Sequence, residues 1–188
     1  MKDETLYKIA RPIIKVLFNF FYRPTYIGRK NIPSSGGFVL AGNHTSYLDP
    51  LLLMSSYDKT IHFLAKDSLI KGIKGIIFKH TGIIPVNRKI HDKDALCEAK
   101  KALNNKQVIG IFPEGTINRT KDLTLPFKIG VVKMAQDTNT LLVPFTITNK
   151  YKLFRKSVII EFYKPYKVVT NLDDENNKLR AFIEDELK

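Results

Sequence analysis

A histidine and an aspartate lie five positions apart in the segment NHTSYLDP, residues 43–50. A neutral histidine can remove a proton from an alcohol, and a carboxylate on its other ring nitrogen fixes the tautomer and stabilises the imidazolium. On a regular helix, five positions separate two side chains by roughly 140°, so His44 and Asp49 would not meet. For this chemistry the segment must be a turn that leaves a strand and enters a helix.

The flanking residues favour such a turn. The apolar run GFVLAG at 37–42 predicts a buried strand, and PLLLMSSY at 50–57 predicts the start of a helix. Asp49 followed by Pro50 is also a standard N-cap and first-turn pair for a helix, which gives the aspartate a structural interpretation. For His44 the structural alternative is a hydrogen-bonded core histidine. The residues alone leave catalysis and these structural roles open.

Covalent catalysis lacks an obvious nucleophile in this chain. There is no GxSxG segment, Ser46 is a weak candidate, and Cys97 is the only cysteine and lies in a helical pattern away from the polar loops. A His–Asp pair without its own nucleophile indicates that the substrate supplies one, such as a hydroxyl. A single cysteine also excludes a disulfide within the chain, which is compatible with a reducing cytoplasm.

A second polar loop, FPEGT at 112–116, follows the apolar run QVIGIF. Gly115 allows backbone N–H groups to approach an anion, and Thr116 adds a hydroxyl. Arg88 in the segment IPVNR can contact a phosphate through two hydrogen bonds. Glu114 cannot favour a phosphate directly, so we expect it to orient Arg88 or a substrate hydroxyl. These residues predict a phosphate site.

The charge of the chain favours polyanionic partners. Its 188 residues include 31 Lys and Arg against 18 Asp and Glu, a net charge of +13, while the 44% hydrophobic share is ordinary for a globular fold. Nucleic acid, an anionic membrane surface and phosphorylated substrates would all suit this excess. We expect no nucleic-acid partner, because no nucleic-acid-binding motif is recognisable, and no metal site, because the histidines lack metal-ligand spacing.

Strand-like runs alternate with helical patterns along the chain. This order predicts an α/β fold with a mainly parallel central sheet flanked by helices. Loops at the carboxyl ends of parallel strands hold the sites of such folds, which would bring the two polar loops together. The expected strands are 37–42, 61–65, 82–86, 107–112, 141–147 and 157–163, and the expected helices start at 50, run around 67–80, and span 92–104, 128–137 and 173–187.

Residues 5–22 predict an amphipathic helix. A cationic stripe beside Phe and Leu side chains is typical of a helix in a bilayer interface, and the alternative is a terminal helix packed on the core of the domain. No uninterrupted apolar span of about 18 residues occurs, so we expect no transmembrane helix. No small-residue cleavage site follows a short apolar region, so we also expect no signal peptide. We assign 1–27 to a membrane-associating N-terminal helix and 28–188 to a catalytic domain. The stripe comprises Lys8, Arg11, Lys15 and Asn19, and the apolar face Leu6, Ile9, Ile13, Leu17 and Phe20 or Phe21.

Four short sequence blocks, taken in their order along the chain, resemble the conserved blocks of the glycerolipid acyltransferase family, specifically the bacterial 1-acyl-sn-glycerol-3-phosphate acyltransferases. The resemblance covers roughly residues 28–150, and a Phe-Lys-x-Gly segment at 127–130 also resembles the family pattern. Any single block is a weak signal, whereas four in order are highly specific. The blocks are NHTSYLD at 43–49, GIIPVNR from Gly82 to Arg88, FPEGT from Phe112 to Thr116, and Val143–Pro144.

The resemblance implies a mechanism. His44, oriented by Asp49, would deprotonate the 2-hydroxyl of a lysophosphatidic acid, and that hydroxyl would attack the thioester of an acyl carrier protein or acyl-CoA. No cofactor is implied beyond this acyl-ACP or acyl-CoA co-substrate. The implied partners are lysophosphatidic acid, the acyl donor and an anionic phospholipid membrane, at whose cytoplasmic face the protein would be peripheral. The implied substrate-binding residues are Arg88, Glu114, Gly115, Thr116 and Lys128.

One position departs from the family pattern. Many members carry Arg directly after the Thr of the third block, whereas this chain has Ile117, with Arg119 two positions later. If Arg119 does not turn inward, phosphate binding depends more on Arg88. Two other interpretations remain: an acyltransferase for another lysophospholipid or related acceptor, and a non-catalytic basic module that binds anionic lipid. The second leaves the His44–Asp49 spacing unexplained.

Overall fold

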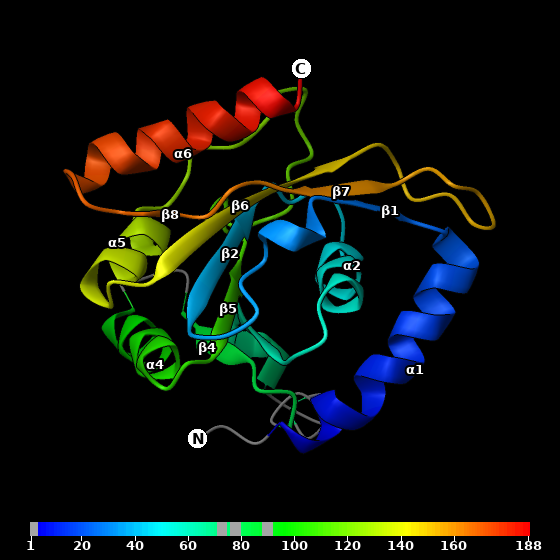
Figure 1. Ribbon diagram of the computed structural model, residues 1–188, viewed down its shortest axis with the longest axis horizontal. Coiled ribbons are helices and arrows are strands. Elements are labelled where there is room, and N and C mark those ends of the chain that lie inside the picture. The colour runs from blue at the N-terminus through cyan, green and yellow to red at the C-terminus, as the bar shows by residue number, and fades with distance from the viewer. Residues whose placement is uncertain (1–3, 71–74, 76–79, 88–91) are drawn as a thin grey trace.

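A computed structural model describes residues 4–70, 75, 80–87 and 92–188 of the chain (Figure 1). Its centre is an eight-stranded sheet with the order β1-β7-β6-β2-β5-β3-β4, in which β8 also pairs with β6. The strands are β1 Thr25–Ile27, β2 Phe38–Gly42, β3 Ile61–Lys66, β4 Ile84–Val86, β5 Val108–Ile111, β6 Leu141–Thr148, β7 Ile159–Phe162 and β8 Tyr166–Lys167. The α-helices are α1 Thr5–Tyr22, α2 Asp49–Ser56, α4 Lys93–Asn104, α5 Gly130–Asp137 and α6 Leu172–Glu186, and short 3₁₀ turns span Arg29–Asn31 and Asp67–Ile70.

Strands β6, β2, β5, β3 and β4 run parallel, and β7 and β8 pair antiparallel with β6. The predicted α/β class with a mainly parallel sheet is therefore confirmed. Strand β2 is buried along its whole length, as expected for a strand covered on both faces. Because β2 and β5 are neighbours and parallel, the loops after them leave the same edge of the sheet.

Helices cover both faces of the sheet (Figure 1). Apolar side chains from α4, α5 and α6 pack on one face around Val39, Ile109 and Leu142. Those of α1 and α2 pack on the other face around Leu40, Val143 and Phe145. Because successive side chains along each strand point to opposite faces of the sheet, they form two separate hydrophobic cores, one on each face.

Most of the predicted elements are present, with two additions. Strands β1 and β8, of three and two residues, were not predicted, because runs this short carry no periodicity. β1 pairs with β7, so the segment 1–27 contributes a strand as well as a helix. The helix expected around 67–80 begins with a 3₁₀ turn at Asp67–Ile70, and most of the rest lies outside the described residues.

Helix α1 turns its polar stripe toward the protein. Arg11 and Lys15 both bind Asp58, and Arg11 also donates to the carbonyl of Tyr57. The helix packs on the domain through the buried Tyr7 and Phe18, yet most of its apolar face points outward. The exposed apolar side chains of α1 are Ile9, Ile13, Val16, Leu17 and Phe20.

The exposure of this apolar face differs from the alternative considered from the sequence, in which a terminal helix packs its apolar face on the core of the domain. Burial in an aqueous protein would place these side chains inward, because each buried Leu, Ile or Phe contributes about 1.5–3 kcal/mol. Among the helices of the described part of the chain, none is long and apolar enough to cross a membrane.

Candidate active site

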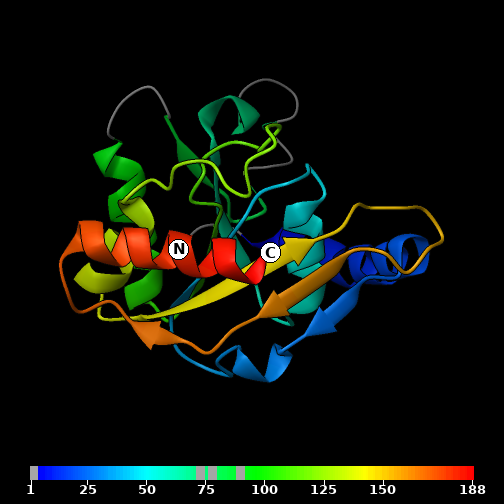
Figure 2. The same cartoon turned by 90° about the horizontal axis from the view of Figure 1, so that it is seen from above.

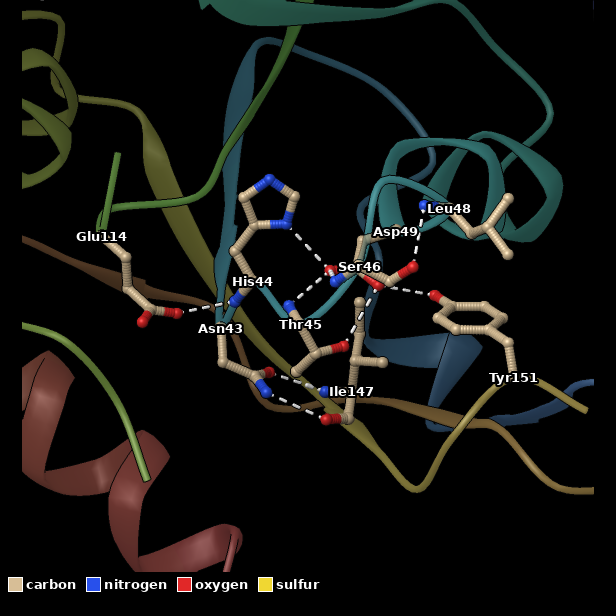
Figure 3. A network of polar contacts seen from close by, with 9 residues as sticks. All are labelled: Asn43, His44, Thr45, Ser46, Leu48, Asp49, Glu114, Ile147 and Tyr151. Atoms are coloured by element: carbon tan, nitrogen blue, oxygen red, sulfur yellow. Dashed lines mark hydrogen bonds and ion pairs between the residues drawn. The ribbon is translucent and has the colours of Figure 1, made fainter. Parts of the chain in front are cut away.

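The chain turns sharply between the end of β2 and the start of α2, as the sequence predicts. The turn brings His44 Nδ1 to 2.8 Å from Asp49 Oδ2 (Figure 3). The carboxylate accepts a hydrogen bond from Nδ1–H, so the lone pair of the neutral ring lies on Nε2, which points away from Asp49. Nε2 has no hydrogen-bonding partner among the described residues. A free basic nitrogen at a strand end is available to a ligand.

Asp49 is completely buried and its carboxylate is fully hydrogen-bonded. Its Oδ2 also accepts from the backbone N–H groups of Thr45 and Ser46, at 2.6 and 2.8 Å. The structural alternative for Asp49, the N-cap of the helix, differs from the structure by one position: Leu48 is the N-cap, Asp49 is the first residue of α2, and its carboxylate turns back to the loop. A buried carboxylate needs such donors, because desolvation would otherwise penalise its charge.

A tyrosine that the sequence did not reveal completes the environment of Asp49. The hydroxyl of Tyr151 donates to Asp49 Oδ1 at 2.6 Å, from the loop between β6 and β7 (Figure 3). Burial, with the adjacent Asp49 charge, raises the pKa of the Tyr151 hydroxyl far above its usual range, so it remains a donor. No sequence signal links residues 102 positions apart through an irregular loop.

The imidazole and its backbone are held on several sides. The ring of His44 stacks on Phe112, with centroids 4.1 Å apart and planes inclined by 15°. The neighbouring Asn43 is buried and exchanges two hydrogen bonds with the backbone of Ile147 in β6. The His44 side chain keeps 14% of its surface exposed. The ring is therefore fixed in orientation but open to a ligand at one edge.

Glu114 holds the two candidate loops together. One carboxylate oxygen accepts from the backbone N–H of His44 at 2.7 Å, and the other from that of Leu125 at 2.7 Å. Burial raises the pKa of Glu114, and the two amide donors partly offset this effect. The sequence predicted that Glu114 orients Arg88 or a substrate hydroxyl. The structure adds that both of its carboxylate oxygens accept hydrogen bonds from backbone N–H groups.

Of the predicted phosphate-binding residues, the structure places Lys128 beside Gly115, which precedes Thr116 in the chain. Gly115 has a φ of +71°, and Lys128 lies so close that a Cβ on residue 115 would be 2.9 Å from its Nζ. Thr116 and Lys128 are exposed. Arg88 lies outside the described residues, whereas Arg119 donates to the hydroxyl of Tyr47 in the His44 loop.

The arrangement can serve as a general base and not as an enzyme nucleophile. The backbone N–H of Ser46 donates to Asp49 and its hydroxyl accepts from the backbone N–H of Leu48, so Ser46 shapes the turn. Cys97 is exposed on α4, away from this turn. His44 and Asp49 therefore form a pair that would activate a hydroxyl carried by a bound molecule.

Comparisons with known proteins define the class. Residues 23–148 match the family model described as "Acyltransferase". The chain therefore belongs to the acyltransferase family, as its motifs predicted. More narrowly, its relatives place it among the 1-acyl-sn-glycerol-3-phosphate acyltransferases.

Two of these relatives are bacterial proteins of that name. The chain is 38% identical to the Borreliella burgdorferi protein over 70% of this chain and 54% of that protein. It is 30% identical to the Bacillus subtilis protein over 74% of this chain and 69% of that protein. The chain thus spans between about half and two thirds of the length of these curated relatives.

A solved structure has the same fold. The crystal structure of the 1-acyl-sn-glycerophosphate acyltransferase from Thermotoga maritima superimposes with a TM-score of 0.74. The match covers 99% of this chain and 82% of that chain, at 22% sequence identity. This likeness confirms the α/β fold.

Proposed function

We propose that this protein transfers an acyl chain from acyl-ACP or acyl-CoA to the sn-2 hydroxyl of 1-acyl-sn-glycerol-3-phosphate, giving phosphatidic acid. The observation that carries the proposal is the His44–Asp49 hydrogen bond of 2.8 Å, with Nε2 free at the exposed edge of the ring. A non-catalytic lipid-binding module would have no need of a completely buried carboxylate aimed at that histidine.

The reaction proceeds by one displacement. His44 Nε2 accepts the proton of the acceptor hydroxyl while the hydroxyl oxygen attacks the thioester carbonyl carbon. Asp49 stabilises the imidazolium that forms. The carbon–sulfur bond of the resulting tetrahedral intermediate then breaks, and His44 returns its proton to the departing thiolate. The products are the ester and a free thiol, and no bond to the enzyme forms.

The acceptor phosphate would lie at the third block. Lys128 supplies a cation beside Gly115, and Thr116 supplies a hydroxyl on the exposed side of the same turn. Arg88 is the further cation that the family pattern assigns to the phosphate. In this arrangement Glu114 fixes the position of the phosphate-binding turn relative to His44, because its carboxylate accepts a hydrogen bond from the His44 backbone N–H.

Helix α1 supports a peripheral location on an anionic membrane. Its exposed apolar side chains, such as Ile13, Val16 and Phe20, suit the acyl boundary of a bilayer, and the net charge of +13 suits anionic headgroups. In a cell this surface would be the cytoplasmic face of the membrane. The lipid acceptor would then reach His44 without leaving the bilayer surface completely.

The proposal is tested by supplying purified protein with lysophosphatidic acid and either acyl-ACP or acyl-CoA, with phosphatidic acid as the product measured. A panel of other lysolipids, offered with the same donor, tests the choice of acceptor. We expect the highest kcat/KM for lysophosphatidic acid. Preference for another lysolipid would reassign the acceptor, and no transfer to any lysolipid would contradict the proposed chemistry.

Removing the hydroxyl of Tyr151 tests its support of Asp49. Tyr151→Phe keeps the ring contacts with Phe18 and Tyr22 but removes the donor to Oδ1. A hydrogen bond to a charged group contributes about 1.5–3 kcal/mol, so we expect kcat to fall about tenfold or more, with the KM for the acyl donor little changed. Steady-state kinetics beside Tyr22→Phe as a control checks this. An unchanged kcat would show that Tyr151 does not position the pair.

Adding a methyl group at residue 115 tests the phosphate turn. In Gly115→Ala the Cβ would displace Lys128, and the left-handed φ would cost about 1–2 kcal/mol of stability. We expect the KM for the acceptor to rise about tenfold, because the cation is moved from the phosphate. Gly36→Ala is the matched control, because Gly36 has a φ of +88° with open space around it. If both variants raise the KM equally, the turn has no special role.

A further inference from the structure

The loop between β6 and β7, residues 149–158, exposes large apolar side chains at its tip. Leu153 is 58% exposed and Phe154 is 53% exposed. Phe154 has a φ of +57°, a left-handed conformation that is unfavourable for a bulky residue and is retained where the surroundings or a function require it. The loop extends from the sheet beside the carboxyl-terminal end of α1 (Figure 2).

This tip is continuous with the outward face of α1. The backbone N–H of Phe154 donates to the carbonyl of Phe21, and the Phe154 ring lies 5.9 Å from that of Phe20 in an edge-to-face arrangement. Phe20 is itself 58% exposed. Two segments far apart in the sequence thus form one apolar surface, which we call the composite surface: Ile13, Val16, Leu17, Phe20, Leu153 and Phe154.

Cations surround the composite surface at the loop. They are all exposed, and none of them forms an ion pair within the part of the chain that the structure describes. The next positive charge along α1, Lys15, is by contrast neutralised by Asp58. Unpaired cations beside exposed aromatic side chains match an anionic lipid surface, because headgroups bind the charges while rings and Leu side chains enter the acyl boundary. These cations are Arg23, Lys150, Lys152, Arg155 and Lys156.

We propose that the β6–β7 loop is a second membrane-contacting element, which together with α1 docks the protein on an anionic bilayer. The inference rests on the proposed function for the nature of the lipid substrate, and it adds the loop to the helix that the sequence indicated. A helix alone would leave the protein free to roll about the helix axis. A second contact at the loop fixes the orientation of the domain on the membrane.

The same loop reaches the catalytic pair, so docking also sets where the reaction occurs. Tyr151 lies three positions before Phe154, and its hydroxyl binds Asp49 at 2.6 Å. Its ring contacts Phe18 and Tyr22 of α1, at centroid distances of 6.1 and 5.7 Å. The loop that carries Leu153 and Phe154 therefore also contacts Asp49 directly, through Tyr151, and a docked protein presents His44 near the lipid that it acylates.

Fluorescence tests the loop directly, because the chain contains no tryptophan. In Phe154→Trp, we expect a blue-shifted emission on mixing with vesicles of phosphatidylcholine and phosphatidylglycerol, and quenching when the lipids carry brominated acyl chains. Val169→Trp is the matched control, since Val169 is 72% exposed but lies after β8, outside the composite surface. We expect its emission to stay unchanged. Emission at 154 that is equally unchanged, while the protein cosediments with vesicles, would overturn the proposal.

Loss of binding provides a second test that does not depend on folding at residue 154. Leu153→Ser removes an exposed side chain, and we expect it to weaken cosedimentation with the same vesicles about tenfold. Lys152→Gln with Arg155→Gln should weaken binding to these vesicles and not to phosphatidylcholine alone. All variants are made in a His44→Ala background, so that binding is measured even if no acyl transfer occurs and the two proposals fail separately.

Self-association is the competing use of the composite surface. Sedimentation velocity without lipid distinguishes the two. We expect the unmodified chain and Leu153→Ser to have the same oligomeric state. A shift from dimer to monomer in Leu153→Ser, with vesicle binding unchanged, would assign the surface to a second copy of the chain and contradict membrane docking.

Discussion

Replacing His44 with alanine is expected to lower the turnover number for acyl transfer by about 10²–10⁴-fold or more, because the variant loses the imidazole that takes the hydroxyl proton. That loss corresponds to about 2.7–5.5 kcal/mol of transition-state stabilisation. The KM for either substrate should change much less, since the imidazole contributes to the transition state rather than to ground-state binding. Initial rates of phosphatidic acid formation measure the effect.

The control for this variant is His80→Ala. His80 is exposed, and its carbonyl accepts a hydrogen bond from the backbone N–H of Leu6 at the start of α1. Tyr151, which supports the catalytic pair, contacts the other end of that helix, at Phe18 and Tyr22. Thermal unfolding of His44→Ala should resemble that of the unmodified chain, because Asp49 keeps its other donors, the backbone N–H of Thr45 and the hydroxyl of Tyr151. A folded His44→Ala protein with a near-normal rate would remove His44 from the mechanism.

The second large effect is expected for Asp49→Asn. The amide is nearly the same size as the carboxylate, but it carries no charge to stabilise the imidazolium and can hold the wrong tautomer of His44. We expect kcat to fall about 10³–10⁴-fold. Some stability should also be lost, because the amide cannot accept from all the donors that bind the carboxylate, namely His44, the backbone of Thr45 and Ser46, and Tyr151.

A double-mutant cycle separates the chemical role of Asp49 from the structural one. If Asp49 acts through His44, the substitution Asp49→Asn should reduce the rate only a few-fold further in a chain that already carries His44→Ala. If instead the two losses multiply, Asp49 supports activity mainly by shaping the turn. Circular dichroism and thermal unfolding of each variant, measured alongside the rates, show whether the turn is retained.

The sequence predicted the parts of the site that lie within one loop. The strand before His44 and the helix after Asp49 are strongly patterned, so their meeting could be inferred from the residues between them. The inference did not extend to how Asp49 is buried. Its carboxylate accepts hydrogen bonds from the loop amides of Thr45 and Ser46, which offsets the cost of burying its charge, and Leu48 holds the N-cap position of α2.

Contacts between distant segments could not be predicted in this way. Tyr151 reaches Asp49 from a loop with no periodic pattern, and its role depends on how β6 and β7 place that loop beside α1. The orientation of α1 was likewise open, because an amphipathic pattern identifies two faces but not which one meets the protein. In the structure the buried Tyr7 and Phe18, with the ion pairs of Arg11 and Lys15 to Asp58, lie on the side that meets the protein.

The central claim is that the acceptor hydroxyl attacks the thioester directly, with His44 as its base. Intact-protein mass spectrometry after incubation with the acyl thioester alone, followed by addition of lysophosphatidic acid, tests this most directly. We expect no acyl mass on the protein before the acceptor is added, and phosphatidic acid formation once it is present. An acyl group that accumulates on the chain and then passes to lysophosphatidic acid would contradict the mechanism.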